Sequence, residues 1–194
     1  MALASPPHRP PLVTIPNALT ASRLGLAVVL FACISAEWWL VGFGTFCVAA
    51  LTDWLDGYVA RLQGLTSSLG RSFDPLVDKV LICGAFIYLQ PVPTAGFTPW
   101  MVTIVVAREL LITGLRGFLE NQGAIFGADW LGKLKMVLQC ATLMAVLLLL
   151  GLGGDAVPGL AASAVGLTYA MLATTVLSGL QYLWRAVILW RATS

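Results

Sequence analysis

Charged residues are scarce in this sequence. Asp, Glu, Lys and Arg make up 10% of its 194 residues, whereas hydrophobic residues make up 59%, and the mean hydropathy is +0.89. Soluble domains contain about 25% charged residues, so this composition argues against a soluble domain. A net charge of +2 is also too small for an extended nucleic-acid-binding surface. The expected solvent of the chain is a lipid bilayer.

Side chains that bind zinc are scarce as well. The chain has one histidine, His8, and four cysteines with neither CxxC spacing nor neighbouring histidines, which excludes a zinc site of the usual kind. We interpret the cysteines as small core residues: Cys33, Cys47, Cys83 and Cys140. The beginning of the chain contains several prolines and lacks the long apolar core of a signal peptide, so we expect residues 1–12 to form a disordered cytoplasmic tail.

Predominantly apolar stretches recur along the whole chain, near residues 24–36, 39–52, 80–90, 97–107, 134–152 and 158–190. A helix that crosses a bilayer needs about 20 such residues. Because lipid offers no hydrogen bonds to the backbone, only helices or closed barrels cross it, and these stretches lack the polar alternation of barrel strands. We therefore expect an all-α integral membrane protein with about six transmembrane helices, which form a single domain over residues 13–194.

Prolines and glycines mark the ends of the expected spans. Pro16 suits the first turn of a helix, while Pro91, Pro93 and the cluster from Gly151 to Gly154 interrupt the apolar runs. The expected spans are 17–34, 38–62, 70–90, 97–119, 130 to the Gly151 cluster, and 158–188.

Basic residues lie near one set of span ends. The connections near Glu37, Pro91 to Pro93 and Asp155 contain none. The opposite ends carry Arg9, Arg61, Arg71, Lys133, Lys135, Arg185 and Arg191. Because cytoplasmic ends are enriched in Lys and Arg, we expect both termini in the cytoplasm and a location in the cell inner (cytoplasmic) membrane.

Four aspartates lie near the cytoplasmic ends of two consecutive expected spans. Asp53 and Asp56 are three residues apart, and Asp74 and Asp78 are four apart, so each pair shares one helix face. A short turn between the spans would bring the two faces together. Such charges repel one another at membrane depth unless protons or cations neutralise them. Because all the ligands are oxygens, the pattern predicts a site for Mg²⁺ or Mn²⁺.

Small residues accompany these acids. Gly57 and Ala60 leave the helix thin, so that a nucleotide or another helix can approach its backbone, and Arg61 can neutralise a pyrophosphate. Taken alone, Gly57 is better explained by helix packing, and Arg61 by the bias of basic residues toward the cytoplasm.

Together these residues match the spacing D-x2-D-G-x2-A-R-x8-G-x3-D-x3-D without departure: Asp53, Asp56, Gly57, Ala60, Arg61, Gly70, Asp74 and Asp78. In this motif the chain resembles the CDP-alcohol phosphotransferase family. The resemblance implies two divalent ions held by the four aspartates and bridged by the pyrophosphate of a CDP-linked substrate. It also implies that Asp78 is the general base, that CMP leaves after attack on the β-phosphoryl group, that Gly57, Ala60, Arg61 and Gly70 bind the CDP-linked lipid, and that the protein is a homodimer.

Cations further along the chain bear on the acceptor. Arg108 and Arg116 are eight residues apart, on roughly one helix face, and Lys133 and Lys135 begin the next span. Four converging cations would bind the phosphate of a phosphorylated alcohol, whereas a free alcohol would not require them. The alternative is that the lysines reach the membrane interface and that Arg108 pairs with Glu109 or Asp78.

The segments around these cations resemble the phosphatidylglycerophosphate synthase branch of the same family. They are Ala107–Leu110, Gly114–Arg116 and Gly132–Lys135, joined by Ile15–Thr20 with Arg23 and by Leu180–Leu183. The resemblance implies CDP-diacylglycerol as donor, sn-glycerol 3-phosphate as acceptor and phosphatidylglycerophosphate as product. The proline-rich beginning departs from an interfacial helix common in the family. A phosphatidylinositol-phosphate synthase, a cardiolipin synthase and, from another class, a cation transporter remain alternatives.

Overall fold

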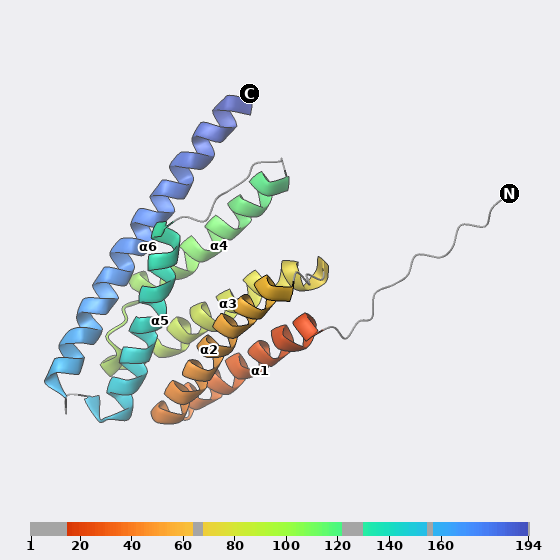
Figure 1. Cartoon of the computed structure of the whole chain (residues 1–194). Coiled ribbons are helices and arrows are strands. Elements are labelled where there is room, and N and C mark those ends of the chain that lie inside the picture. The colour runs from red at the N-terminus through yellow and green to blue at the C-terminus, as the bar shows by residue number, and fades with distance from the viewer. Residues whose placement is uncertain (1–14, 64–67, 122–129, 155–156, 194) are drawn as a thin grey trace.

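A computed structural model describes the backbone of residues 15–63, 68–121, 130–154 and 157–193 (Figure 1), and the side chains of 21–52, 77, 79–118, 130–154, 157 and 159–188. The described residues form six α-helices and one short 3-10 helix. They are α1 (Ile15–Ser35), α2 (Trp39–Gln63), α3 (Ser68–Leu89), η1 (Pro93–Ala95), α4 (Pro99–Asn121), α5 (Trp130–Gly151) and α6 (Pro158–Thr193). The described ranges contain no strand, which confirms the all-α prediction.

The six helices correspond one to one with the six stretches expected from the sequence. The largest difference is at the end of α6, which continues to Thr193 rather than ending at residue 188. Its last residues include Trp190 and Arg191, whose helix propensities are adequate, so only the loss of apolar character suggested an earlier end. Residues 1–12, expected as a tail, lie outside the described ranges.

Proline and glycine end the helices where expected. The chain leaves α3 at Leu89, passes through η1, and turns at Gly96, which has a φ of 73°. After α5, Gly153 and Gly154 adopt φ values of 90° and 68°, a region that side chains with a Cβ rarely enter.

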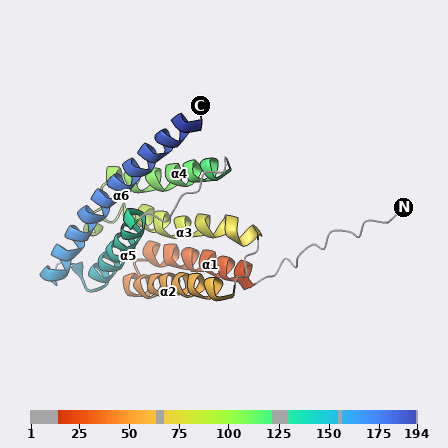
Figure 2. The same cartoon turned by 45° about the horizontal axis from the view of Figure 1, so that its top comes forward.

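Helix α1 packs against both α2 and α3, and α5 packs against both α2 and α6 (Figure 2). Helix α4 contacts α3 and α6. The core between them is apolar, with Leu30, Phe46, Phe86, Leu143 and Leu147 almost fully buried.

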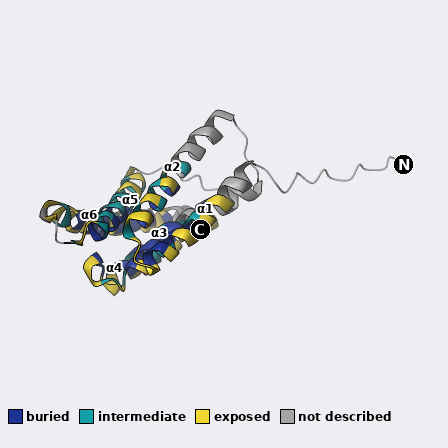
Figure 3. Ribbon diagram, turned by 90° about the horizontal axis from the view of Figure 1, so that it is seen from below, coloured by how far each residue is buried: buried dark blue, intermediate teal, exposed yellow. Residues whose placement is uncertain are grey.

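The outer faces of the bundle are apolar too. In the described parts of the helices, exposed residues alternate with buried ones (Figure 3), and every helix has large hydrophobic side chains among its exposed residues. Examples with 50% to 64% of their surface exposed are Val28, Val41, Ile87, Leu111, Val137 and Leu177. So much exposed apolar surface is unfavourable in water and favourable in hydrocarbon, as expected of a membrane protein.

Two described helices are long and apolar enough to cross a bilayer, judged by length and composition. They are α5, with a mean hydropathy of 2.0, and residues Gly159–Ile188 of α6, with 1.7. Shorter apolar stretches occupy Ala21–Ser35, Trp39–Thr52 and Lys79–Leu89. Six transmembrane helices therefore remain a prediction.

Close contact between α1 and α3 depends on Gly84. The ring of Phe31 lies against this glycine and stacks on Tyr88, with ring centroids 4.8 Å apart. A Cβ at residue 84 would lie 2.1 Å from the Cζ atom of Phe31, so any larger residue displaces the ring.

We expect Gly84→Ala to lower the apparent melting temperature of the purified protein in detergent, because overpacking costs about 1–3 kcal/mol. Gly44→Ala on α2 is the matched control, since no atom lies within 4 Å of its added Cβ. That control should be neutral or should stabilise the helix by up to about 1 kcal/mol. Equal melting temperatures for the two variants would contradict the proposed close contact.

Candidate functional site

The aspartate motif lies on two consecutive helices. Asp53 and Asp56 belong to α2, Asp74 and Asp78 belong to α3, and residues 64–67 connect the two helices. The side chains of all eight motif residues lie outside the described ones, so the aspartate metal site and the CDP-lipid contacts of Gly57, Ala60, Arg61 and Gly70 stay predictions. Among the described residues, no cluster of His, Cys, Asp or Glu side chains is suited to a metal ion.

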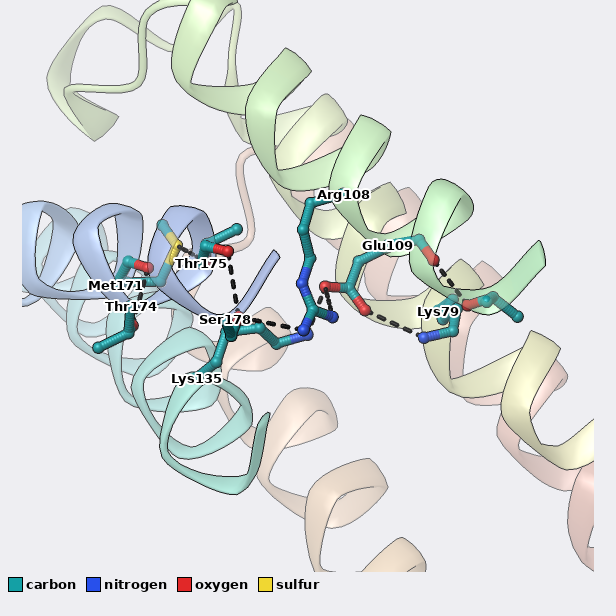
Figure 4. A network of polar contacts seen from close by, with 9 residues as sticks. Lys79, Arg108, Glu109, Lys135, Met171, Thr174, Thr175 and Ser178 are labelled. Carbon is teal, nitrogen blue, oxygen red and sulfur yellow. Dashed lines mark hydrogen bonds and ion pairs between the residues drawn. The ribbon is translucent and has the colours of Figure 1, made fainter. Parts of the chain in front are cut away.

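A buried carboxylate stands at the centre of the described polar residues. Glu109 on α4 is 4% exposed and pairs with cations from three helices (Figure 4). Its Oε2 accepts a hydrogen bond from Lys79 Nζ of α3 at 3.0 Å, and its Oε1 accepts one from Arg108 Nη1 at 3.2 Å and one from Lys135 Nζ of α5. We call these four residues the Glu109 cluster. The exposed fraction of their side chains is between 5% and 23%, so water screens the interactions between their charges only weakly.

Helix α6 holds the guanidinium of Arg108 from the other side. Arg108 Nη2 donates to Ser178 Oγ at 3.0 Å, and Ser178 Oγ in turn donates to the Thr175 carbonyl at 3.1 Å. The guanidinium carbon lies 5.8 Å from the centroid of the Tyr182 ring, within range of a cation–π contact. Gly179 allows this approach, because an added Cβ would lie 3.3 Å from Arg108 Cγ.

Among the residues with described side chains, two buried donors on α4 and α5 lack a hydrogen-bond partner. One is the Nε atom of Arg108, and the other is the Nε2 atom of Gln139. Gln139 is 2% exposed and lies one helical turn after Lys135, hence on the same face of α5. An unsatisfied buried donor costs about 1–3 kcal/mol, so both atoms favour an oxygen ligand.

The structure brings together two of the four cations that the sequence assigns to the acceptor phosphate. Arg108 and Lys135 meet on Glu109, whereas Lys133 and Arg116 are exposed. The pairing of Arg108 with Glu109, left open above as an alternative, is present. This pairing uses only part of the guanidinium's hydrogen-bonding capacity, because the group has five N–H donors. Lys135 is 5% exposed, so the alternative that it extends to the membrane interface is wrong.

Sequence reasoning missed Lys79, Ser178 and the central place of Glu109. The sequence did contain a signal for Lys79 and Glu109, because Lys79 lies inside an expected span and Glu109 is the one acid between residues 97 and 119. Ionisable residues at membrane depth need partners of opposite charge. Ser178 has no such signal, since its role depends on which helix packs beside α4.

We expect Ser178→Ala to lower stability by about 1–3 kcal/mol, because the buried guanidinium loses the partner of its Nη2 atom. Ser163→Ala on the same helix is the matched control: its hydroxyl is exposed and donates only to the Gly159 carbonyl, and its loss should change stability by less than about 0.5 kcal/mol. Apparent melting temperatures in detergent measure both. A similar loss in both variants would show that Ser178 does not support Arg108.

Comparisons with known proteins agree with the resemblance inferred from the aspartate motif. Residues 13–180 match the family described as CDP-alcohol phosphatidyltransferase. The chain is 34% identical to the CDP-diacylglycerol–glycerol-3-phosphate 3-phosphatidyltransferase of Bacillus subtilis, over 69% of this chain and 76% of that protein. It is 33% identical to the protein of the same name from Cereibacter sphaeroides, over 86% of this chain and 76% of that protein.

A plant protein shows the same similarity over a longer stretch. The chain is 29% identical to CDP-diacylglycerol–glycerol-3-phosphate 3-phosphatidyltransferase 2 of Arabidopsis thaliana, over 91% of this chain and 82% of that protein. The matched residues include the aspartate motif and the whole Glu109 cluster. On this evidence, the chain belongs to the CDP-alcohol phosphatidyltransferase family of membrane enzymes.

Proposed function

We propose that this enzyme transfers the phosphatidyl group of CDP-diacylglycerol to sn-glycerol 3-phosphate, giving phosphatidylglycerophosphate and CMP. The observation that carries the proposal is the group of three cations around the buried Glu109, of which the first, Lys79, comes one residue after Asp78. It would bring a phosphate-binding site close to the predicted general base, as a phosphorylated alcohol requires. The relatives named above carry the same activity in their names.

The donor set of the aspartate motif fits a hard divalent cation. Asp53, Asp56, Asp74 and Asp78 offer only carboxylate oxygens, which Mg²⁺ and Mn²⁺ prefer. In the proposed enzyme the four residues would hold two such ions, which would supply positive charge to stabilise the charge on the phosphoryl groups of the donor.

The remaining steps belong to the chain's own residues. Asp78 accepts the proton of the acceptor hydroxyl, whose oxygen forms a bond to the β-phosphorus of CDP-diacylglycerol. The bond from that phosphorus to the bridging oxygen breaks, and CMP leaves with the bond's electrons. Gly57, Ala60 and Gly70 allow the nucleotide to approach the helices closely, and Arg61 neutralises the pyrophosphate.

The acceptor phosphate would bind the cations of α4 and α5. Lys135 is the buried cation of this site, the Arg108 side chain is 11% exposed, and Arg116 and Lys133 are exposed. Arginine presents a planar pair of donors to phosphate oxygens. A phosphorylated acceptor offers these cations a negatively charged group and a free alcohol does not, which favours a phosphorylated acceptor over an unphosphorylated one.

The arrangement in the membrane is part of the same proposal. Residues 13–194 form one domain that crosses the membrane six times, with both termini and the active site at the cytoplasmic face, as the distribution of basic residues indicates. The location is the cell inner (cytoplasmic) membrane, and the assembly is a homodimer.

We expect purified protein to release CMP only when CDP-diacylglycerol, sn-glycerol 3-phosphate and Mg²⁺ or Mn²⁺ are all present, and chelation of the metal to abolish release. Asp74→Asn and Asp78→Asn should each lower kcat at least about 100-fold, as for loss of a general base or a metal ligand. Glu37→Gln is the control, because this exposed acid lies between α1 and α2, just before the end of α2 that is remote from Asp53 and Asp56. Full activity in either aspartate variant would refute the mechanism, and metal flux into liposomes would favour a transporter.

For the acceptor, we expect Arg108→Ala and Arg116→Ala to raise KM for sn-glycerol 3-phosphate while KM for CDP-diacylglycerol stays nearly constant. A lost charged hydrogen bond of about 1.5–3 kcal/mol corresponds to roughly a 10-fold to 100-fold change. Arg185→Ala is the matched control, since this arginine is exposed on α6. Equal turnover of an inositol phosphate or of phosphatidylglycerol would assign the chain to another branch of the family.

A further inference from the structure

The Glu109 cluster is not neutral. Among its described side chains, Lys79, Arg108 and Lys135 supply three positive charges and Glu109 supplies one negative charge. Two positive charges therefore remain without a counter-ion among these residues. Charges removed from water need a partner of opposite sign. The excess positive charge of the cluster therefore favours the binding of an anion.

We propose that Glu109 is a positioning residue for the acceptor: it gathers the cations of three helices into one cluster whose remaining charge matches a doubly charged phosphate monoester. This inference rests on the proposed function and adds Lys79 and Glu109 to the residues that determine acceptor binding. Glu109 acts through the cations and does not itself contact the phosphate.

The geometry of the carboxylate supports this role. Lys79 uses one oxygen of Glu109 at 3.0 Å, while Arg108 and Lys135 share the other. Three cations held within reach of a single carboxylate lie close to one another and would repel if the carboxylate were absent. Glu109 therefore holds them together before any substrate binds, and this preorganisation lowers the free energy needed to form the site.

The unused donors of the cluster suit a phosphate. Each lysine has three N–H donors, of which one contacts Glu109. Among the described residues, the Nε atom of Arg108 and, beside the cluster on α5, the Nε2 atom of Gln139 have no hydrogen-bond partner. A phosphate group consists of acceptors only, so it can satisfy donors that an alcohol or an amine cannot.

Charge selects among phosphates. A phosphate monoester carries a charge of about −1.5 to −2 near pH 7, which the two remaining positive charges balance. A phosphate diester carries a single negative charge and would leave one cation unbalanced. Arg116 and Lys133 are exposed, so water screens them and they need no buried counter-ion.

Anchoring by α6 separates the contribution of Glu109 from that of Arg108. The Arg108 guanidinium is also held by Ser178 Oγ at 3.0 Å, whereas Glu109 is the described hydrogen-bond partner of both lysine ammonium groups. Loss of the Glu109 charge therefore releases mainly Lys79 and Lys135. Removal of the Glu109 charge and removal of the Arg108 side chain therefore affect acceptor binding through different cations.

The test compares Glu109→Gln, Glu109→Asp and Lys79→Met in the purified full-length enzyme, at saturating CDP-diacylglycerol, by CMP release. Glu109→Gln keeps the shape of the side chain and removes its charge. We expect KM for sn-glycerol 3-phosphate to rise at least about tenfold, equal to about 1.4 kcal/mol, with KM for CDP-diacylglycerol within about twofold. Glu109→Asp should recover part of the loss, and inorganic phosphate should become a correspondingly weaker competitive inhibitor of Glu109→Gln.

Lys79→Met keeps the test decisive if Glu109→Gln does not fold, because Glu109 then still pairs with Arg108 and Lys135. We expect it to raise KM for sn-glycerol 3-phosphate about threefold to tenfold. The double variant that combines Glu109→Gln with Lys79→Met loses one negative and one positive charge, so the cluster again has two positive charges in excess. Its KM for sn-glycerol 3-phosphate should therefore not exceed that of Glu109→Gln alone. Thr142→Val is the control: it is a fully buried residue of α5 whose hydroxyl donates to the Leu138 carbonyl.

Three outcomes would overturn the inference. An unchanged KM for the acceptor in Glu109→Gln or Lys79→Met would show that the ion pairs of Glu109 serve only the stability of the structure. A lower KM in Glu109→Gln would show that the carboxylate competes with the phosphate instead of positioning the cations. An equal rise in the KM for sn-glycerol 3-phosphate in the control Thr142→Val would show that the effect of Glu109→Gln is not specific to the cluster. A wild-type enzyme that releases no CMP with sn-glycerol 3-phosphate would refute the proposed function itself, a result distinct from these three.

Discussion

The arrangement of α3 to α6 depends on a single carboxylate that has been removed from water. Glu109 is 4% exposed and pairs with cations of α3, α4 and α5, while one of those cations, Arg108, also contacts Ser178 of α6. Apolar packing in lipid discriminates weakly between helix positions, because lipid tails are as apolar as leucine. Buried ion pairs discriminate strongly, since a misplaced partner leaves a charge without compensation. The Glu109 cluster therefore fixes the relative positions of helices that apolar contacts alone would hold loosely.

The other half of the bundle is held by a different principle. Helix α1 packs against α2 and α3 through apolar side chains, and it approaches α3 closely at Gly84, where the Phe31 ring occupies the place of a Cβ. Helix α3 belongs to both halves: it carries Asp74 and Asp78 of the motif and, at the next position, Lys79 of the Glu109 cluster. Any displacement of α3 would change the predicted metal site and the cation cluster together.

The sequence predicts most of the helices and only part of the site, for physical reasons. The helices follow from contiguous apolar runs that end at Pro91, Pro93 and the glycines after residue 151, and the aspartate motif follows from spacing within two helices. Such signals are local. The contacts of Lys79 and Ser178 depend on which helices lie beside α4, which local spacing does not determine. Arg108 illustrates the limit, because the sequence allowed a phosphate, Glu109 and Asp78 as partners, and its contact with Ser178, 70 residues away, became evident only from the packed helices.

The order of residues on α3 also bears on how one small acceptor could reach two different groups. Asp74 and Asp78 share one face of the helix, whereas Lys79 lies about 100° further around the axis and reaches Glu109 on α4 at 3.0 Å. In the proposed reaction the acceptor must place its phosphate among cations and its hydroxyl beside the general base. Asp78 and Lys79 are consecutive residues of one helix, so helix geometry sets the separation of their backbone positions. The other two cations, Arg108 and Lys135, belong to α4 and α5, so their distance from the predicted base depends on how these helices pack against α3, which is where the ion pair between Lys79 and Glu109 acts.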